Sequence, residues 1–184
     1  MVSQRLQIAL DALTAGGVVA CPTEAVWGLS CDPDNPDAVE RLLTLKQRPV
    51  AKGLILVASD IAQLDGLLAG LAEGQLARLR LSWPGPATWL IPHHGRVPPW
   101  VCGDHDTVAV RVTAHPGMRA LCDAWGGALV STSANPGGAQ PPRERFQVQR
   151  YFGGQLDAIL PGTVGGADRP STIRDLLTDQ IVRP

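Results

Sequence analysis

The apolar positions of the chain follow two spacings, one typical of helices and one typical of strands. Near the start, four apolar side chains recur three or four residues apart: Leu6, Ala9, Leu10 and Leu13. This spacing predicts a helix that ends at Gly16-Gly17, where the chain can turn. Residues 54–58 are instead apolar without interruption, which is typical of a strand covered on both faces of a sheet.

The same two patterns predict helices and strands that alternate along the chain. Strands are predicted at 18–21, 54–58, 88–91, 107–112, 128–130, 158–160 and 170–175. Helices are predicted at 6–13, 36–46, 59–68, 76–83, 118–125 and 146–151, and residues 22–30 and 97–103 are predicted as loops. Because no repeat or linker interrupts this alternation, we expect one α/β domain over residues 1–184, with a mixed, twisted sheet.

Composition narrows the class of protein. The formal net charge of -1 and the pI near 6.4 argue against a protein held to nucleic acid by its total charge. The four cysteines have no paired metal-ligand spacing, so we expect free thiols. The chain starts with an amphipathic run, which does not resemble a signal peptide, and no stretch approaches the ~20 apolar residues of a membrane span. We therefore expect a cytoplasmic protein.

Polar groups gather directly after the first predicted strand. Pro22 cannot donate a ladder hydrogen bond, so we expect the strand to stop there. Thr23, Glu24 and Trp27 follow within five residues, before Gly28. Ligands of open α/β sheets often bind at such positions, although an ordinary turn gives the same pattern. Trp27 could stack on a base or form a pocket wall.

Three cations precede the buried strand at 54–58. Lys46, Arg48 and Lys52 could hold a triphosphate, with Arg48 as a fork of donors and the lysines as point charges. Cations in the last turn of a helix also complement its dipole, so a solvated helix end remains an alternative. The chain has no P-loop and no GxGxxG motif, so a nucleotide would need another architecture.

Two further positions could serve a ligand. Ser131-Thr132-Ser133-Ala134-Asn135 ends a predicted strand with hydroxyl, amide and backbone groups that suit phosphate or Mg²⁺, or that form a local turn. Arg111 lies within a valine-rich strand and needs an anionic partner, because an unpaired buried charge is very costly. That partner is a ligand carboxylate or phosphate, or else Glu24 or an aspartate.

Other catalytic chemistry is not indicated. The four histidines show no metal-ligand spacing, no serine lies in a Gly-x-Ser-x-Gly elbow, and no Ser-His-Asp arrangement can be argued. We therefore expect no protein-held metal site.

Taken together, the motifs resemble those of the YrdC/TsaC family of threonylcarbamoyl-AMP synthases, in its short bacterial form. The similarity covers essentially the whole chain and rests on five segments in order: Pro-Thr-Glu-Ala-Val-Trp-Gly-Leu (22–29), Leu-Lys-Gln-Arg-Pro (45–49) with Lys52, Val-Ala-Val-Arg (108–111), Ser-Thr-Ser-Ala-Asn (131–135) and Pro-Ser-Thr-Ile (170–173). The resemblance implies a twisted open α/β sheet, flanked by helices around a large concave cavity. It also implies that L-threonine, bicarbonate and ATP, with Mg²⁺, give L-threonylcarbamoyl-AMP and diphosphate. A partner transferase complex then uses the product to modify tRNA.

The resemblance also assigns site residues. Its catalytic cations are Lys46, Arg48 and Lys52, which also bind ATP together with Thr107, Ser133, Asn135 and Pro141. L-Threonine is bound by Thr23, Ala25, Arg111, Ser131 and Ser171, with Arg111 on its carboxylate. Nucleotidyl transfer depends on positioning and charge neutralisation, so no activated serine or cysteine is required.

The chain departs from the family at four positions. Relatives commonly carry threonine at Ala25, tyrosine at Trp27, glycine at Ser30 and histidine at Val57. A hydroxyl at 25 and an imidazole at 57 therefore cannot contact L-threonine in this chain.

Two alternatives remain from the sequence. One is a tRNA- or double-stranded RNA-binding module without ATP turnover, whose cavity cations grip the backbone directly. The other is a carbamoyl-AMP-forming domain, as in hydrogenase maturation proteins. The near-neutral charge disfavours RNA binding as the only role.

Overall fold

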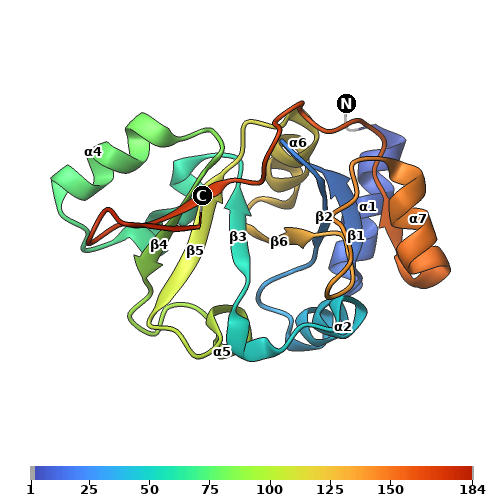
Figure 1. Cartoon of the computed structure of the whole chain (residues 1–184), viewed down its shortest axis with the longest axis horizontal. Coiled ribbons are helices and arrows are strands. Elements are labelled where there is room, and N and C mark those ends of the chain that lie inside the picture. The colour runs from blue at the N-terminus through green and yellow to red at the C-terminus, as the bar shows by residue number, and fades with distance from the viewer. Residues whose placement is uncertain (1–2, 184) are drawn as a thin grey trace.

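Strands that are distant in sequence pair in one mixed sheet. The computed structural model describes residues 3–183; Met1, Val2 and Pro184 of the predicted domain lie outside the described residues. The strands are β1 (Val19–Pro22), β2 (Trp27–Ser30), β3 (Ile55–Ala58), β4 (Ala87–Pro92), β5 (Thr107–Val112), β6 (Leu129–Ser133), β7 (Ala158–Ile159), β8 (Thr172–Asp175) and β9 (Ile181–Arg183). Their order is β7-β1-β2-β6-β3-β5-β4-β8-β9, with three parallel pairs, β1–β7, β3–β5 and β4–β8. The predicted mixed, twisted α/β sheet is confirmed (Figure 1).

Helices connect most of these strands. The α-helices are α1 (Gln4–Thr14), α2 (Pro36–Lys46), α3 (Asp65–Leu68), α4 (Glu73–Ser82), α5 (Pro99–Cys102), α6 (Pro116–Trp125) and α7 (Arg145–Phe152). Short 3-10 turns lie at Val50–Lys52, Ile61–Leu64 and Gly153–Gln155. None of the helices within residues 3–183 is long and apolar enough to cross a membrane.

The end signals of α2 act as the sequence indicates. The Asn35 side chain accepts a hydrogen bond from the backbone N–H of Ala38 at 3.1 Å, and Pro36 occupies the first helical position. At the other end, Gln47 adopts a left-handed conformation, with φ 51°, and turns the chain out of the helix. The segment Arg48–Gly53 is thereby directed back toward β3.

The two faces of the sheet are covered differently. On one face, α1 and α6 pack over the strands through Ala9, Leu13, Met118, Leu121, Cys122 and their strand partners Val19, Cys21, Val57 and Leu129. The opposite face carries the larger core, to which α2, α4 and α7 contribute Leu42, Leu79 and Phe152. All four cysteines are buried and unpaired, as expected.

The prediction of a loop over residues 22–30 is wrong in its second half. Residues 27–30 form β2, which pairs antiparallel with β1, so the polar stretch is a hairpin turn limited to residues 23–26. The Thr23 side chain closes that turn by donating to the Val26 backbone oxygen at 2.7 Å. Pro22 is tolerated as the last residue of β1, where the strand is ending.

Trp27 is also not where the sequence suggested. Its ring is 1% exposed within the larger core, because Trp27 and Leu29 alternate with Gly28 and Ser30 along β2. Trp27 is therefore not among the residues that line the cavity described below. The predicted loop at 97–103 contains the short helix α5, and β9 had no counterpart among the predicted strands.

Candidate functional site

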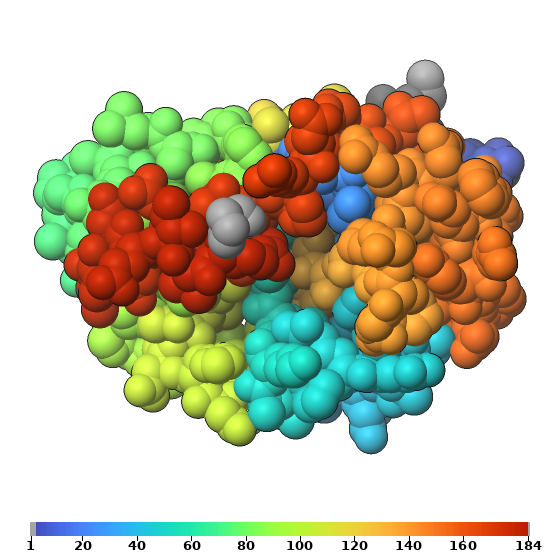
Figure 2. Space-filling model, in the orientation of Figure 1, coloured from blue at the N-terminus to red at the C-terminus, as the bar shows by residue number. Residues whose placement is uncertain are grey.

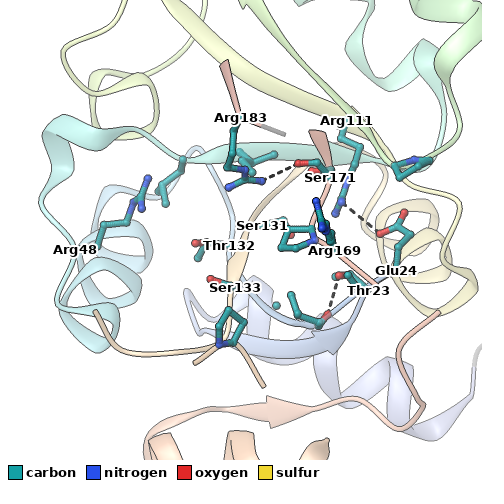
Figure 3. Close-up of a pocket in the computed structure, with 18 residues that line it drawn as sticks. Thr23, Glu24, Arg48, Arg111, Ser131, Thr132, Ser133, Arg169, Ser171 and Arg183 are labelled. Carbon is teal, nitrogen blue, oxygen red and sulfur yellow. Dashed lines mark hydrogen bonds and ion pairs between the residues drawn. The ribbon is translucent and has the colours of Figure 1, made fainter. Parts of the chain in front are cut away.

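A cavity of about 210 Å³ opens on the face of the sheet that α1 and α6 cover only in part. It is bordered by the turn after β1, the strands β3, β5 and β6, the segment Arg169–Ser171, and Arg183 of β9. Figure 2 shows this hollow near the centre of the molecule, beside the C-terminal segment that crosses in front of the sheet. Figure 3 shows the side chains that line it.

The alternation of residues along β3 and β6 explains why the cavity is polar. Alternate residues of a strand face the same side, so Leu129, Ser131 and Ser133 share a face of β6, as Ile55 and Val57 do of β3. Val57 and Leu129 lie in the apolar cluster with α6. Ile55, Ser131 and Ser133, beyond that cluster, line the cavity.

Arg111 and Glu24 form the buried ion pair of this cavity. Nη1 of Arg111 lies 3.4 Å from Oε2 of Glu24, with side-chain exposures of 9% and 13%. The other carboxylate oxygen, Oε1, accepts hydrogen bonds from the Thr113 hydroxyl at 2.7 Å and from the Ala114 N–H at 3.0 Å. The sequence left a ligand, Glu24 or an aspartate as possible anionic partners of Arg111. Within the chain, that partner is Glu24. Oε2 of Glu24 and Nε of Arg111 are buried and make no hydrogen bond among residues 3–183.

These contacts decide the charge of the pair. Burial raises the pKa of Glu24, but the charge of Arg111 and the hydrogen bonds from Thr113 and Ala114 outweigh it and leave the pKa below its ordinary value. Burial also lowers the pKa of Arg111, which the charge of Glu24 partly offsets. Since a guanidinium starts from a very high pKa, both groups are ionised near neutral pH.

The residues expected around L-threonine all line this one cavity: Thr23, Ala25, Arg111, Ser131 and Ser171. The Ser171 hydroxyl lies 2.7 Å from the hydroxyl of Thr88, and both residues are buried. Ala25 is 4% exposed and presents a methyl group where the resemblance implied a hydroxyl. Val57, the other departure near this substrate, is in the apolar core instead of the cavity wall.

The residues expected around ATP are divided between two adjoining cavities, and two of them line neither. Arg48, Ser133 and Pro141 line the same cavity as Arg111. Lys52 and Thr107 line an adjoining cavity of about 220 Å³, and the two cavities share Arg48, Leu54, Ile55 and Arg183. Lys46 and Asn135 line neither cavity. The Asn135 side chain donates to the Ala139 backbone oxygen at 2.8 Å, within its own turn.

Arg48 reaches the cavities from a tightly held loop. Its Nη2 donates to the backbone oxygen of Gly53 at 2.8 Å, and burial lowers its pKa. Gly53 has φ 61°, and a Cβ there would lie 2.8 Å from the Cys102 backbone oxygen. A side chain at this position would collide with the Cys102 backbone, so the close approach of the loop that carries Arg48 requires glycine.

Two cavity arginines were not singled out by the sequence. Arg183 lies in β9 and donates to the Ser171 backbone oxygen at 3.0 Å; burial first, then the charges of Arg111 and Arg48, lower its pKa. Arg169 lies in an irregular segment and extends into the cavity (Figure 3). Neither lies in a motif that the sequence singled out, and it is the path of the chain that places them here. Thr132 of β6 also lines the cavity, within the motif that the sequence did identify.

The segment that carries Arg169 is fixed to the turn after β1. Gly165 N–H donates to the Thr23 backbone oxygen, and Ala167 N–H to that of Glu24, both at 3.0 Å. The His115 ring accepts from the Met118 N–H at Nδ1, so its Nε2–H donates to the Thr163 oxygen at 3.0 Å. Residues 163–167 are therefore held against the turn that carries Thr23 and Glu24.

The described residues hold no cluster of three or more histidine, cysteine, aspartate or glutamate side chains that could bind a metal ion. Glu24 is the single carboxylate among the residues lining the two cavities. Its oxygens are directed to Arg111, Thr113 and Ala114, so the cavity walls do not form a ready Mg²⁺ site.

Known proteins are similar to this chain in sequence and in fold. The Sua5/YciO/YrdC family model, described as "Telomere recombination", matches residues 11–184. A threonylcarbamoyl-AMP synthase from Pseudomonas aeruginosa is 58% identical over 182 residues, covering 99% of this chain and 98% of the relative. One from Pseudomonas putida is 55% identical over 185 residues and covers both chains completely. The crystal structure of P. abyssi Sua5 complexed with L-threonine has a TM-score of 0.90 and 31% identity, covering 97% of this chain. This chain spans about half of that one, at 53%.

Proposed function

The chain belongs to the Sua5/YciO/YrdC family, and we propose that its two adjoining cavities make threonylcarbamoyl-AMP and diphosphate from L-threonine, bicarbonate and ATP. Full-length relatives with this activity favour it over RNA binding without turnover and over carbamoyl-AMP formation. The observation that carries the proposal is the pair of cavities joined at Arg48 and Arg183. A reaction between an amino acid and a nucleotide needs two such compartments, with cations where they meet.

The first cavity suits an amino acid. Its wall combines an ionised arginine and an ionised carboxylate, which complement the two charges of a zwitterion. We assign the L-threonine carboxylate to Arg111, and we assign Thr23, Ala25, Ser131 and Ser171 to the surrounding wall. The P. abyssi structure with L-threonine supports an amino-acid site in this fold.

The second cavity suits a nucleotide. Leu54, Ile55, Leu90, Ile173 and Val182 give it apolar walls, which an adenine ring can contact. Arg48, Lys52 and Arg183 lie at its cationic side and are placed to neutralise phosphate oxygens. We assign Thr107, Ser133 and Pro141 to the nucleotide as well, with Asn135 and Lys46 behind the wall.

The chemistry requires positioning more than activated side chains. The L-threonine ammonium first loses a proton, and the resulting amine and bicarbonate form a carbamate with loss of water. A carbamate oxygen then attacks the α-phosphorus of ATP. The phosphorus–oxygen bond to the β-phosphate breaks, and diphosphate leaves with that electron pair. Arg48 and its neighbours would offset the negative charge that develops on the phosphates. Mg²⁺ is assigned to the substrate, as the complex of ATP, because the cavity walls offer it no free carboxylate.

Diphosphate release tests this function. The protein should release diphosphate only when L-threonine, bicarbonate and ATP are all present. Arg48→Ala should reduce the rate by about a hundredfold or more, since a charge-neutralising donor is lost. Arg80→Ala is the matched control. Arg80 is exposed, lines neither cavity, and forms an ion pair with Glu73, with 2.8 Å between Nη1 and Oε1. Release without L-threonine, or an unchanged rate in Arg48→Ala, would contradict the proposal.

The setting of the reaction is proposed on the same basis. We propose that residues 1–184 act as one unit, because the first cavity draws on residues from Thr23 to Arg183. The product would pass to a transferase complex that modifies tRNA. A cytoplasmic location is supported by four unpaired thiols, which persist in a reducing compartment.

A further inference from the structure

Lys46, the last residue of α2, points its ammonium at the backbone that follows β6. The residue is 5% exposed, and Nζ donates to the backbone oxygens of Ser133 and Asn135, the latter at 2.9 Å. The backbone oxygen of Lys46 accepts a hydrogen bond from Gly137 N–H at 2.8 Å. Both the side chain and the main chain of Lys46 therefore hold the turn 133–137 against the end of α2.

Its surroundings do not resemble those of a phosphate ligand. Lys46 is absent from the lining of both cavities, and it has no ion pair among residues 3–183. Two of the three ammonium N–H donors are directed to carbonyl oxygens. Burial, and then the charge of Arg48, lowers the pKa of Lys46 to about 8. A cation that contacts ATP directly is expected to line a cavity, as Arg48 does.

The turn that Lys46 holds is part of that wall. Ser133 lines the first cavity, and Ala134 N–H donates to the Trp27 backbone oxygen at 2.8 Å. Asn135 N–H donates to the Ser133 backbone oxygen at 2.9 Å, so the turn is closed upon itself. A shift of this turn would move the Ser133 hydroxyl and the neighbouring backbone groups relative to both proposed substrates.

We infer that Lys46 is a positioning residue, which fixes the Ser133–Gly137 turn in the cavity wall and acts on the substrates only through that turn. This differs from the sequence-based assignment of Lys46 as a catalytic cation on the ATP phosphates. The kinetic consequences rest on the proposed function, whereas the structural role does not.

Hydrogen exchange tests the structural role without any substrate. The sequence contains two lysines, Lys46 and Lys52, so Lys52→Met is a matched control for Lys46→Met. In the full-length protein, the amides of Ala134, Asn135 and Gly137 should exchange about tenfold or more faster in Lys46→Met, because charge-assisted hydrogen bonds that close the turn are lost. Lys52→Met should leave them unchanged. Exchange at these amides that is the same in both variants would overturn the inference.

Steady-state kinetics separate positioning from phosphate binding. Lys46→Met should lower kcat and raise the KM of both L-threonine and ATP, because Ser133 lines the first cavity together with Arg48, which both cavities share. Lys46→Arg keeps the charge and would serve a phosphate at least as well, but its larger head does not fit a buried position between two carbonyl groups. We therefore expect Lys46→Arg to be impaired and to loosen the same amides. An almost unchanged Lys46→Arg, with only the ATP KM raised in Lys46→Met, would overturn the inference.

The role of Lys46 can still be tested if one variant does not fold or if the protein shows no activity. If Lys46→Met does not fold, Lys46→Arg is compared with Lys52→Arg by the same two measurements. If the unsubstituted protein releases no diphosphate, the proposed function is wrong, but the exchange of Ala134, Asn135 and Gly137 still decides the role of Lys46.

Discussion

Arg111 and Glu24 meet in the cavity wall with 3.4 Å between Nη1 and Oε2, although they come from a central strand and from a hairpin turn. The backbone oxygen of Glu24 accepts a hydrogen bond from the Ala167 N–H, and its side chain accepts hydrogen bonds from Thr113 and Ala114. The carboxylate in turn compensates a guanidinium that burial would otherwise leave unpaired. The pair therefore stabilises the fold and, under the proposed function, orients the group that receives the amino-acid carboxylate.

Removing the charge of Glu24 should destabilise the protein. Glu24→Gln keeps the shape of the side chain but leaves Arg111 as an uncompensated buried charge, which costs about 3 kcal/mol. The exposed pair Glu73–Arg80 gives the matched control, because Glu73→Gln should cost less than about 1 kcal/mol. Urea unfolding measures both free energies. Equal losses in the two variants would show that the buried pair contributes no more than a surface pair.

Acid should remove the contribution of this pair. The pKa of folded Glu24 lies below its ordinary value of 4.5, so the folded state binds its proton less readily than the unfolded state. The stabilisation is complete above about pH 4.5 and is lost as the pH falls through the folded pKa. The difference in unfolding free energy between the unsubstituted protein and Glu24→Gln should therefore shrink from pH 5 to pH 3. A difference that stays constant over that range would rule out this linkage.

The Ser171 hydroxyl should matter for L-threonine more than its partner hydroxyl does. Ser171→Ala removes a group that lines the first cavity and leaves the buried Thr88 hydroxyl unpaired, which costs about 1–2 kcal/mol of stability. Thr88→Val removes the same hydrogen bond, but Thr88 does not line the cavity. We expect the KM of L-threonine to rise in Ser171→Ala and to change much less in Thr88→Val. Equal rises would mean that Ser171 acts only through its bond to Thr88.

The close approach of residue 165 to the turn after β1 should be sensitive to a single methyl group. A Cβ at Gly165 would lie 3.2 Å from both the Cα and the backbone oxygen of Glu24. Gly165→Ala should therefore displace the segment that carries Arg169, cost roughly 1–3 kcal/mol of stability and raise the KM of L-threonine.

Gly154 provides the control for that substitution, because a Cβ there would meet no atom within 4 Å. Gly154→Ala should leave the KM values of L-threonine and ATP unchanged. Thermal unfolding and initial rates distinguish the two variants, and an L-threonine KM unaffected by Gly165→Ala would contradict the role of this contact.

Much of the fold could be predicted because its signals are local. The amphipathic spacing of α1, the Asn35-Pro36 start of α2 and the alternation of β5 each depend on residues within a few positions of one another. The strand β2 was not predicted, because its own residues carry little local signal. Four residues containing a glycine and a serine carry a weak strand signal, and only pairing with β1 and β6 stabilises them.

The amino-acid sequence by itself determined which chemical groups are available and which face of a strand each one shares. It placed the hydroxyl groups of Ser131 and Ser133 at the end of a predicted strand, and it required an anionic partner for Arg111, because both conclusions follow from the apolar pattern of the strands and the cost of burying a charge. Only the tertiary structure decided that Glu24 is that partner, that Lys46 faces two carbonyl oxygens, and that Arg183 enters the cavities. The reason is physical: hydrogen-bond partners and burial are set by contacts between distant segments, which no local spacing encodes.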